Sequence, residues 1–218
     1  MRESEIRLLY INLDPAKIDP ETLAAWLGQL PERKQAQIRK HQHHANRVQS
    51  TLGWRLVEQA MHQLGFADFT LAAVDFNSPH KSGSAFPADF NISHSGNLVC
   101  AAALRDARLG IDVERIRPLK SDVIHKYLNG NEAQQCENEP ARFFDFWTQK
   151  EAIIKAHGQE GIVRLREVEL LNDQGRFADK TWYLTPLHLA DGYAGHIATD
   201  CPTTRLEIEK VDPYQVRK

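Results

Sequence analysis

Residues 109–116 read LGIDVERI, an apolar segment that is interrupted by two carboxylates. Its apolar side chains alternate with small or charged ones, and this period of two is typical of a β-strand. Asp112 and Glu114 are two positions apart, so their side chains leave the same face of that strand, about 6–7 Å from each other. Like charges placed this way repel. The segment therefore predicts either a solvated edge strand or a strand whose carboxylates share a cation.

Short extended pieces surround this strand. Residues 90–93 (FNIS) lead into a turn at residues 95–97 (SGN), which is followed by residues 98–104 (LVCAAAL). Because these connections are short, we predict an antiparallel meander that ends in the 109–114 strand. The first strand of the chain is predicted at residues 5–13 (EIRLLYINL).

Each half of the chain also has one long predicted helix. The first lies in a very basic stretch that opens at Pro31 and stops at Gly65. The second runs from about Pro140 to His157 and is ended by Gly158. Strands and helices are mixed without a repeating βαβ order, so the predicted class is α+β with antiparallel sheets.

The composition is that of an ordinary globular chain. Among 218 residues, 42% are hydrophobic and 26% are charged, and the formal net charge is −2. This balance gives no global positive field that would attract nucleic acid or an anionic membrane. No apolar run reaches the roughly 20 residues of a membrane span, and the N-terminus lacks an export signal. The three cysteines lack disulfide spacing, so we expect a soluble cytoplasmic protein.

A second possible site lies in residues 146–155, which read FWTQKEAIIK. Glu151 and Lys155 are one helical turn apart and share a face of the predicted helix. One interpretation is a solvated ion pair on the surface. Trp147 lies one turn earlier on the same stripe, however, and an aromatic residue there favours a stripe that faces protein or a cleft. This segment alone leaves both interpretations open.

A third possible site lies in residues 91–96, which read NISHSG. The Ser93 hydroxyl, the His94 imidazole and the turn amides together could bind phosphate oxygens. The alternative is a polar turn with a histidine on its rim. A Ser-His hydrolase is a weaker interpretation, because there is no G-x-S-x-G elbow and no third partner. Residues 41–44 (HQHH) lack the spacing of a metal site, and we interpret them as part of a solvated basic helix.

In order and spacing, these three segments resemble the 4′-phosphopantetheinyl transferases of the larger, surfactin-synthetase type. The matching stretches are FNISHSGNLVCAAA (90–103), LGIDVERIRPL (109–119) and FWTQKEAIIKAHGQEG (146–161). The resemblance implies two similar subdomains related by a pseudo-twofold axis, each with an antiparallel sheet packed on a long helix. We expect the subdomains at residues 1–104 and 105–218, with coenzyme A and Mg²⁺ in the cleft between them.

The resemblance also implies roles for individual residues. Asp112, Glu114 and Glu151 fall on the family's metal ligands, and Glu151 is also its favoured general base. Lys155 would stabilise phosphate charge, so Glu151, Lys155 and Asp112 are the expected catalytic residues. The residues that fall on coenzyme A contacts of the family, or near them, are Arg33, Arg47, Lys81, Ser93, His94, Lys150 and Lys155.

The family moves the phosphopantetheine arm of coenzyme A onto a serine of an acyl or peptidyl carrier protein and releases 3′,5′-ADP. Such chemistry depends on positioning and on neutralising charge around phosphorus. The chain departs from the family pattern at residues 80–82 (HKS for Gly-Lys-Pro) and 158–161 (GQEG for Gly-Lys-Gly). The alternatives are an Mg²⁺-dependent hydrolase of nucleotide pyrophosphates and a catalytically silent module that binds coenzyme A or a carrier. A single-chain pseudodimer implies a monomer, and the sequence does not identify the carrier.

Overall fold

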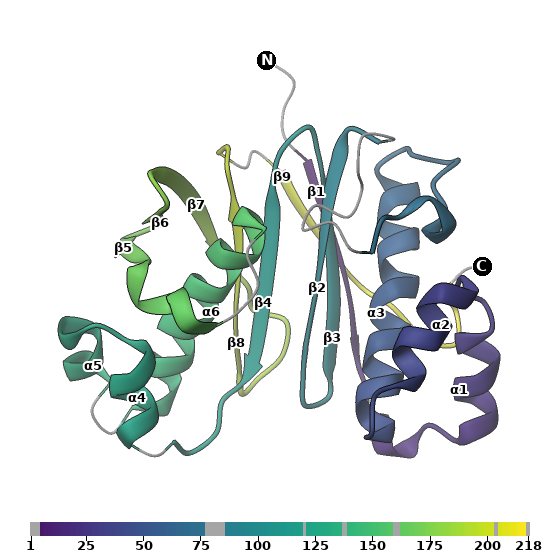
Figure 1. Cartoon of the computed structure of the whole chain (residues 1–218), viewed down its shortest axis with the longest axis horizontal. Coiled ribbons are helices and arrows are strands. Elements are labelled where there is room, and N and C mark those ends of the chain that lie inside the picture. Colours follow the sequence, from purple (N-terminus) through teal and green to yellow (C-terminus); the bar gives the residue numbers. More distant parts are fainter. Residues whose placement is uncertain are drawn as a thin grey trace.

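Two β-sheets stand side by side at the centre of the molecule, and a long helix covers the outer face of each (Figure 1). The computed structural model describes residues 5–76, 86–119, 121–136, 139–158, 162–202 and 205–216. From one side to the other, the layers are helix, sheet, sheet and helix. The α+β class predicted from the sequence is confirmed.

The first sheet is mixed, with two antiparallel strand pairs and one parallel pair. Its members are β1 (Glu5–Asn12), β2 (Ala88–Ser95), β3 (Leu98–Arg105) and β9 (Arg205–Lys210). Their order across the sheet is β2-β3-β1-β9. The antiparallel β2-β3 hairpin is the first part of the predicted meander. The prediction that residues 109–114 continue this meander is wrong, because that strand pairs in the second sheet and β1 takes the place beside β3. In contrast, β9 pairs with β1 in parallel, which is possible because the chain reaches β9 only after crossing the second sheet.

The second sheet is antiparallel throughout its pairs. Its members are β4 (Leu109–Arg115), β5 (Glu169–Leu171), β6 (Gln174–Phe177), β7 (Lys180–Pro186) and β8 (Tyr193–Thr199). Their order is β4-β8-β7-β6-β5, so the LGIDVERI strand β4 forms the edge that faces the first sheet.

The basic stretch after Pro31 forms two helices rather than one. The helices beside the first sheet are α1 (Pro20–Leu27), α2 (Glu32–Arg39) and α3 (His44–Gln63). Arg47, in the first turn of α3, donates from Nε to the carbonyl oxygen of His41 at 2.8 Å, which stabilises the break between α2 and α3. The HQHH segment therefore forms a corner between two helices and not the predicted part of one basic helix.

The C-terminal segment returns to the first sheet. Val211 and Val216 pack in the core beneath α3. Arg55 of that helix donates hydrogen bonds to the carbonyl oxygens of Pro213 (3.2 Å) and Val216 (2.6 Å). A division of the chain after residue 104 therefore separates the two sheets except for this returning segment.

The long helix α6 (Pro140–His157) covers the second sheet and has the bounds that the sequence predicted. Gly158 follows it with a φ of 85°, the left-handed conformation that glycine adopts most easily. The shorter helices of this half are α4 (Ser121–Tyr127), α5 (Gly130–Gln135) and a 3-10 helix (Ile162–Glu167). In the part of the chain that the structure describes, no helix is long and apolar enough to cross a membrane.

Apolar side chains fill the space between the two sheets. Ile6 and Leu8 of β1 share one cluster with Ile111 and Val113 of β4, and none of these side chains is more than 1% exposed. Because side chains alternate along a strand, this anchoring directs Asp112 and Glu114 to the opposite face of β4. That face lies against α6, so the core decides where the two carboxylates point.

Candidate functional site

The edge strands of the two sheets meet through side chains rather than through backbone pairs. Backbone N–H groups of β4 donate to side-chain oxygens of β2 at 3.1–3.3 Å. The donor and acceptor pairs are Leu109 with Asp89, Ile111 with Asn91, Val113 with Ser93, and Arg115 with Ser95. These bonds satisfy amides at a sheet edge that would otherwise be buried without partners. They also fix β2 against the strand that carries Asp112.

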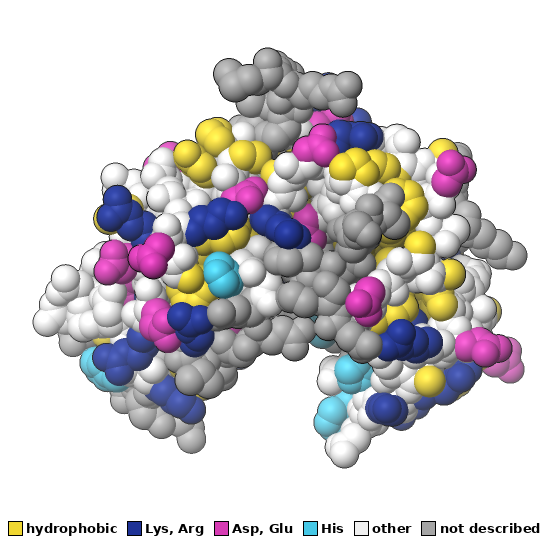
Figure 2. All heavy atoms as spheres, turned by 45° about the horizontal axis from the view of Figure 1, so that its top comes forward, with side chains coloured by type: hydrophobic (Ala, Val, Ile, Leu, Met, Phe, Trp, Pro, Cys, Tyr) yellow, Lys and Arg dark blue, Asp and Glu magenta, His cyan; other side chains and the backbone are white. Residues whose placement is uncertain are grey.

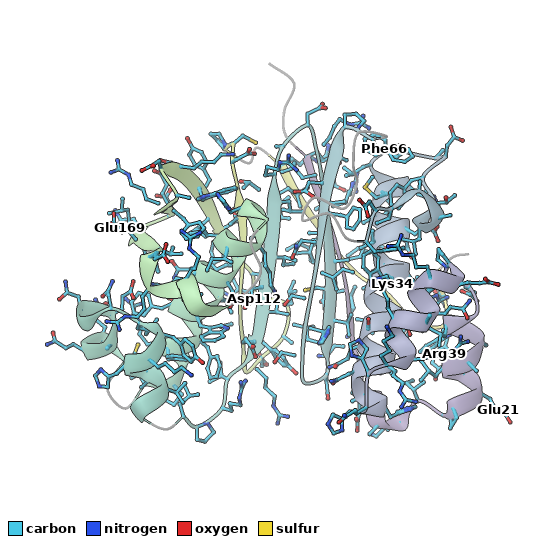
Figure 3. The ribbon with its side chains drawn as sticks, in the orientation of Figure 1. Glu21, Lys34, Arg39, Phe66, Asp112 and Glu169 are labelled. Atoms are coloured by element: carbon cyan, nitrogen blue, oxygen red, sulfur yellow. The ribbon has the colours of Figure 1, made fainter. Side chains whose placement is uncertain are left out.

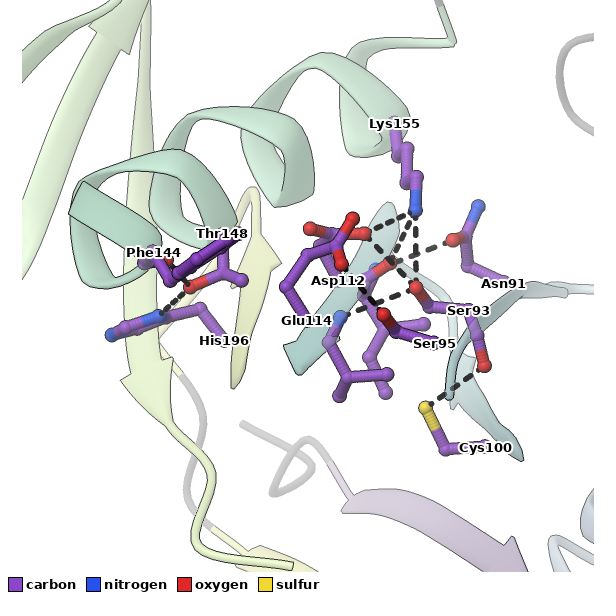
Figure 4. Close-up of polar contacts among 12 residues, drawn as sticks. Asn91, Ser93, Ser95, Cys100, Asp112, Glu114, Phe144, Thr148, Lys155 and His196 are labelled. Atoms are coloured by element: carbon purple, nitrogen blue, oxygen red, sulfur yellow. Dashed lines mark hydrogen bonds and ion pairs between the residues drawn. The ribbon is translucent and has the colours of Figure 1, made fainter. Parts of the chain in front are cut away.

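Asp112 lies near the middle of the molecule, between the two lobes (Figure 3), and is 4% exposed. Its Oδ1 atom accepts hydrogen bonds from the Ser93 hydroxyl (2.9 Å) and from the Lys155 ammonium (2.7 Å; Figure 4). Lys155 also donates to the carbonyl oxygen of Ile111 at 3.2 Å. The structure therefore brings together one residue from each of the three sequence segments. It excludes a solvated edge position for Asp112.

Glu114 lies nearer the surface on the same face of β4. Its Oε2 atom accepts a hydrogen bond from the Ser95 hydroxyl (2.6 Å) and pairs with Arg117 (3.1 Å). The two carboxylates of LGIDVERI are thus tied to two serines of the NISHSG segment, Ser93 and Ser95, and each also has a basic partner.

The electrostatics of this region are dominated by carboxylates. Burial is the main cause that raises the pKa of Glu151 to about 7; Lys155 opposes this effect, and the negative charges of Asp112 and Glu114 add to it. Burial also raises the pKa of Asp112, although Lys155 opposes it. For Lys155, burial disfavours the ammonium, but Asp112 and, to a smaller extent, Glu151 and Cys100 together outweigh this and raise its pKa. The region therefore holds more carboxylate charge than Lys155 neutralises.

Two carboxylate oxygens here are buried without a hydrogen-bond partner, namely Asp112 Oδ2 and Glu151 Oε1. Such oxygens are costly to bury, and a divalent cation such as Mg²⁺ would satisfy them. The donor chemistry therefore fits magnesium. Among the described residues, no group of three or more acidic, histidine or cysteine side chains is already arranged to hold a metal ion. Lys155, which pairs with Asp112, takes one of the oxygens that a metal would need.

Three of the residues that were predicted to contact coenzyme A lie in the half of the molecule that holds the first sheet. Arg47 lies in the first turn of α3, and Arg33 is exposed on α2. His94 lies near the end of β2, where loss of hydration lowers the pKa of its imidazole and the positive charges of Lys155 and His41 lower it further. Figure 2 shows a notch between the half with the first sheet and the half with the second sheet, and we call this notch the cleft. Histidine side chains lie on the wall that belongs to the half with α2 and α3. Lys81 and residues 159–161 lie outside the described residues.

Comparison with known proteins shows which family the second half of the chain resembles. Residues 108–199 match a family described as the 4′-phosphopantetheinyl transferase superfamily. This segment of the chain is similar to the superfamily over its whole matched length. The matched segment runs from β4 to β8 and contains Asp112, Glu114, Glu151 and Lys155. The resemblance predicted from the three sequence segments is therefore confirmed.

Individual members of the superfamily are similar to parts of the chain. The 4′-phosphopantetheinyl transferase psf-1 of Bacillus pumilus is 39% identical over 75 residues, which are 32% of this chain and 32% of that protein. The 4′-phosphopantetheinyl transferase ffp of Bacillus subtilis is 28% identical over 138 residues, or 58% of this chain and 59% of that protein. The transferase Sfp of Bacillus subtilis strain 168 is 26% identical over 141 residues, or 59% and 60%. These matches span between 32% and 60% of the relatives' own length.

Lys150, which the resemblance placed among the coenzyme A contacts, lies on α6 away from the cleft. Lys150 is 0% exposed, and its ammonium pairs with Glu132 of α5 at 2.8 Å. It also donates to the carbonyl oxygens of Leu165 (3.2 Å) and Val168 (2.9 Å). All three ammonium hydrogens are thereby used inside the protein. The structure does not bring Lys150 to the coenzyme A side, so we infer that it supports α6 instead of binding the substrate.

Replacement Lys150→Met is expected to destabilise the protein by about 3 kcal/mol, because Glu132 would keep a buried carboxylate without its partner. The double variant Lys150→Met/Glu132→Gln should be more stable than Lys150→Met, since it removes the unpaired charge. Urea unfolding measures both. As a control, Lys180→Met breaks the exposed ion pair with Asp200 and should cost at most about 1 kcal/mol. If Lys150→Met were as stable as Lys180→Met and only bound coenzyme A more weakly, the supporting role would be wrong.

Two buried residues that contact the secondary-structure elements of the site were not identified from the sequence. Glu132 forms a capping box with Asn129, and the N-x-x-E spacing of that box is a signal that could have located it. His196 lies opposite Asp112 in the β4–β8 pairing, with its Nδ1 2.8 Å from Thr148 Oγ1. Burial lowers the pKa of His196 to about 4, so it is neutral at pH 7 and adds no charge beside Asp112. An isolated histidine on a strand gives no signal that sequence reasoning could use.

Proposed function

We propose that this cleft transfers the 4′-phosphopantetheine arm of coenzyme A to a serine of an apo acyl or peptidyl carrier protein and releases 3′,5′-ADP. The observation that carries the proposal is the pair of buried, unpartnered carboxylate oxygens on Asp112 and Glu151, beside the Lys155 ammonium. This combination offers anionic metal ligands and a cation for phosphate in one place. The names of the relatives support the same reaction.

The proposed metal ligands are Asp112, Glu114 and Glu151. A magnesium ion bound there would supply charge neutralisation to the pyrophosphate oxygens of coenzyme A. The chain's own contribution is preorganisation. Two of the carboxylates extend from the strand β4 and the third extends from the helix α6, and both this strand and this helix are packed in the core. Their positions are therefore set before the substrate arrives.

Glu151 is the proposed general base, because its Oε1 atom is unpartnered and its pKa of about 7 suits proton transfer near neutral pH. The serine oxygen would form a bond to the phosphorus that carries pantetheine. The bond from this phosphorus to the bridging oxygen of the pyrophosphate would break, and 3′,5′-ADP would leave with the electron pair. The serine proton would go to Glu151, while Lys155 would stabilise the charge on the departing phosphate.

The nucleotide end is proposed to lie against Arg47 and His94 on the opposite wall. Arg33 and Lys81 are further proposed contacts that rest on the resemblance. Ser93 already bonds both Asp112 and the backbone of β4, so its position supports a role in holding Asp112 next to any phosphate that it contacts.

The two alternatives require less than the chain provides. A hydrolase of nucleotide pyrophosphates would need the metal ligands but no carrier protein, and the relatives are named as transferases. A silent binding module would have no use for a base and a phosphate-stabilising lysine in one place. No observation on the described residues favours either alternative.

The test of the proposal is the production of 3′,5′-ADP from coenzyme A and Mg²⁺, with and without apo acyl and peptidyl carrier proteins. Chromatography of the nucleotides measures it. We expect 3′,5′-ADP only when a carrier is present, in a one-to-one ratio with the modified carrier, and none after chelation of the metal. Release of nucleotide without a carrier would favour the hydrolase, and no release with any carrier would contradict the proposal.

We also propose that the chain acts as a monomer in the cytoplasm. Both sheets and both long helices come from one chain and already flank one cleft, so a second copy is not needed to complete it. All three cysteines are free, which supports a reducing compartment. Light scattering of the purified protein tests the monomer, and a dimer mass at micromolar concentration would contradict it.

A further inference from the structure

The turn between β2 and β3, residues 95–97, is held from both halves of the molecule. From the side of the first sheet, Gln49 of α3 donates from Nε2 to the carbonyl oxygen of Gly96 at 2.7 Å. From the side of the second sheet, the hydroxyl oxygen of Tyr193 accepts a hydrogen bond from the Asn97 N–H at 2.9 Å. Gln49 is buried, and Tyr193 is half-buried at the start of β8.

The turn is also packed closely against the second sheet. Gly96 has a φ of 56°, and a Cβ atom there would lie 2.7 Å from the Tyr193 hydroxyl oxygen and 3.0 Å from Arg115 Cδ. The carbonyl oxygen of Asn97 accepts a further bond from the Leu13 N–H at 2.9 Å. The carbonyl oxygens of Gly96 and Asn97 and the N–H of Asn97 are therefore fixed by groups from three other segments.

The position of this turn affects the cleft, because the turn follows directly on cleft residues. Ser95 donates to Glu114 at 2.6 Å (Figure 4). It also accepts a hydrogen bond from the Arg115 N–H at 3.1 Å. His94 is the residue before Ser95. In the β4–β8 pairing, Tyr193 lies opposite Arg115, so its hydroxyl links the turn to the end of the strand that carries Glu114. A shift of the turn would move His94 and Ser95 but would leave Glu151 and Lys155 on α6 in place.

We propose that Tyr193 is a positioning residue whose hydroxyl, together with Gln49, holds residues 95–97 so that the two walls of the cleft stay at the spacing that coenzyme A binding requires. The inference rests on the proposed function for the identity of the ligand. Tyr193 touches no reacting atom in this account and acts through Asn97 and the neighbouring Ser95. Its loss should therefore weaken binding of the nucleotide more than it slows the chemical step.

The test is the variant Tyr193→Phe, which removes the hydroxyl and keeps the ring. We expect the dissociation constant for coenzyme A, measured by calorimetry, and the KM for coenzyme A to rise about fivefold, the loss expected for one hydrogen bond. The kcat at saturating coenzyme A should stay within about twofold, because uniform binding is lost and not transition-state stabilisation. The matched control is Tyr183→Phe, which removes a hydroxyl from β7 of the same sheet and should change neither constant.

Equal coenzyme A binding by Tyr193→Phe and Tyr183→Phe would overturn the inference, as would a fall in kcat with an unchanged KM. If Tyr193→Phe does not fold, Gln49→Met decides instead, because it removes the bond from the other half and should raise the same dissociation constant. The same measurements distinguish failure of the proposed function from failure of the role of Tyr193. A wild-type chain that binds no coenzyme A would refute that function, whereas normal binding by both variants would refute only the role of Tyr193.

Discussion

Replacement Glu151→Gln is expected to reduce transfer of phosphopantetheine by about 10²- to 10⁴-fold while the protein stays folded. Glutamine has the size of glutamate, but it cannot accept the serine proton and brings no negative charge to a metal ion. Because burial and neighbouring carboxylates hold the pKa of Glu151 at about 7, its charge is unfavourable in the metal-free protein. The variant should therefore be at least as stable as the wild type without metal.

Initial rates of carrier modification and thermal unfolding curves measure the two effects. The matched control is Glu139→Gln, which makes the same change at an exposed residue beside the first turn of α6. This control should keep normal activity. A Glu151→Gln rate within a few-fold of the control would remove Glu151 from the mechanism, whatever its position in the cleft.

Replacement Gly110→Ala is expected to destabilise the protein by about 3 kcal/mol or to prevent folding, although it adds a single methyl group. The added Cβ would lie inside van der Waals contact of the Ala152 carbonyl oxygen and the Ala156 amide nitrogen. These are backbone atoms of α6, which cannot move aside without lifting the helix from β4. The glycine in LGIDVERI is thus what allows α6 to lie close enough to β4 for Lys155 to contact Asp112.

Denaturant unfolding tests this expectation, with Gly130→Ala as the control, because a Cβ at Gly130 meets no atom within 4 Å. The control should be as stable as the wild type. Wild-type stability of Gly110→Ala would mean that α6 and β4 are not packed as described, and the geometry of the candidate site would then be in error.

Local sequence patterns predicted the elements that carry the site. The alternation in residues 109–116 indicated a strand, and Pro140 and Gly158 marked the ends of α6, because both signals depend only on neighbouring residues. From the residues alone, a solvated edge strand remained an alternative interpretation for the two carboxylates of β4. The order of the three segments, through the family that they resemble, indicated that Asp112, Ser93 and Lys155 converge, and the structure brings them together.

Local sequence patterns could not predict the contacts between distant segments. The pairing of β9 with β1 depends on a return of the chain from the second sheet, and no signal in residues 205–210 specifies a parallel partner. The burial of Lys150 depends on Glu132 and on carbonyl groups after α6, so a sequence motif that places it next to Glu151 suggested a cleft position that the fold does not give it. The bonds between β2 and β4 likewise join residues about twenty positions apart, where composition and periodicity carry no information.

The central claim is tested most directly by the intact mass of an apo carrier protein after incubation with this chain, coenzyme A and Mg²⁺. The account predicts that the carrier gains the mass of one phosphopantetheine group on its serine, and that Glu151→Gln leaves the carrier unmodified under the same conditions. Carriers of both the acyl and the peptidyl class that keep their apo mass, with a wild-type chain that is folded and binds coenzyme A, would contradict it.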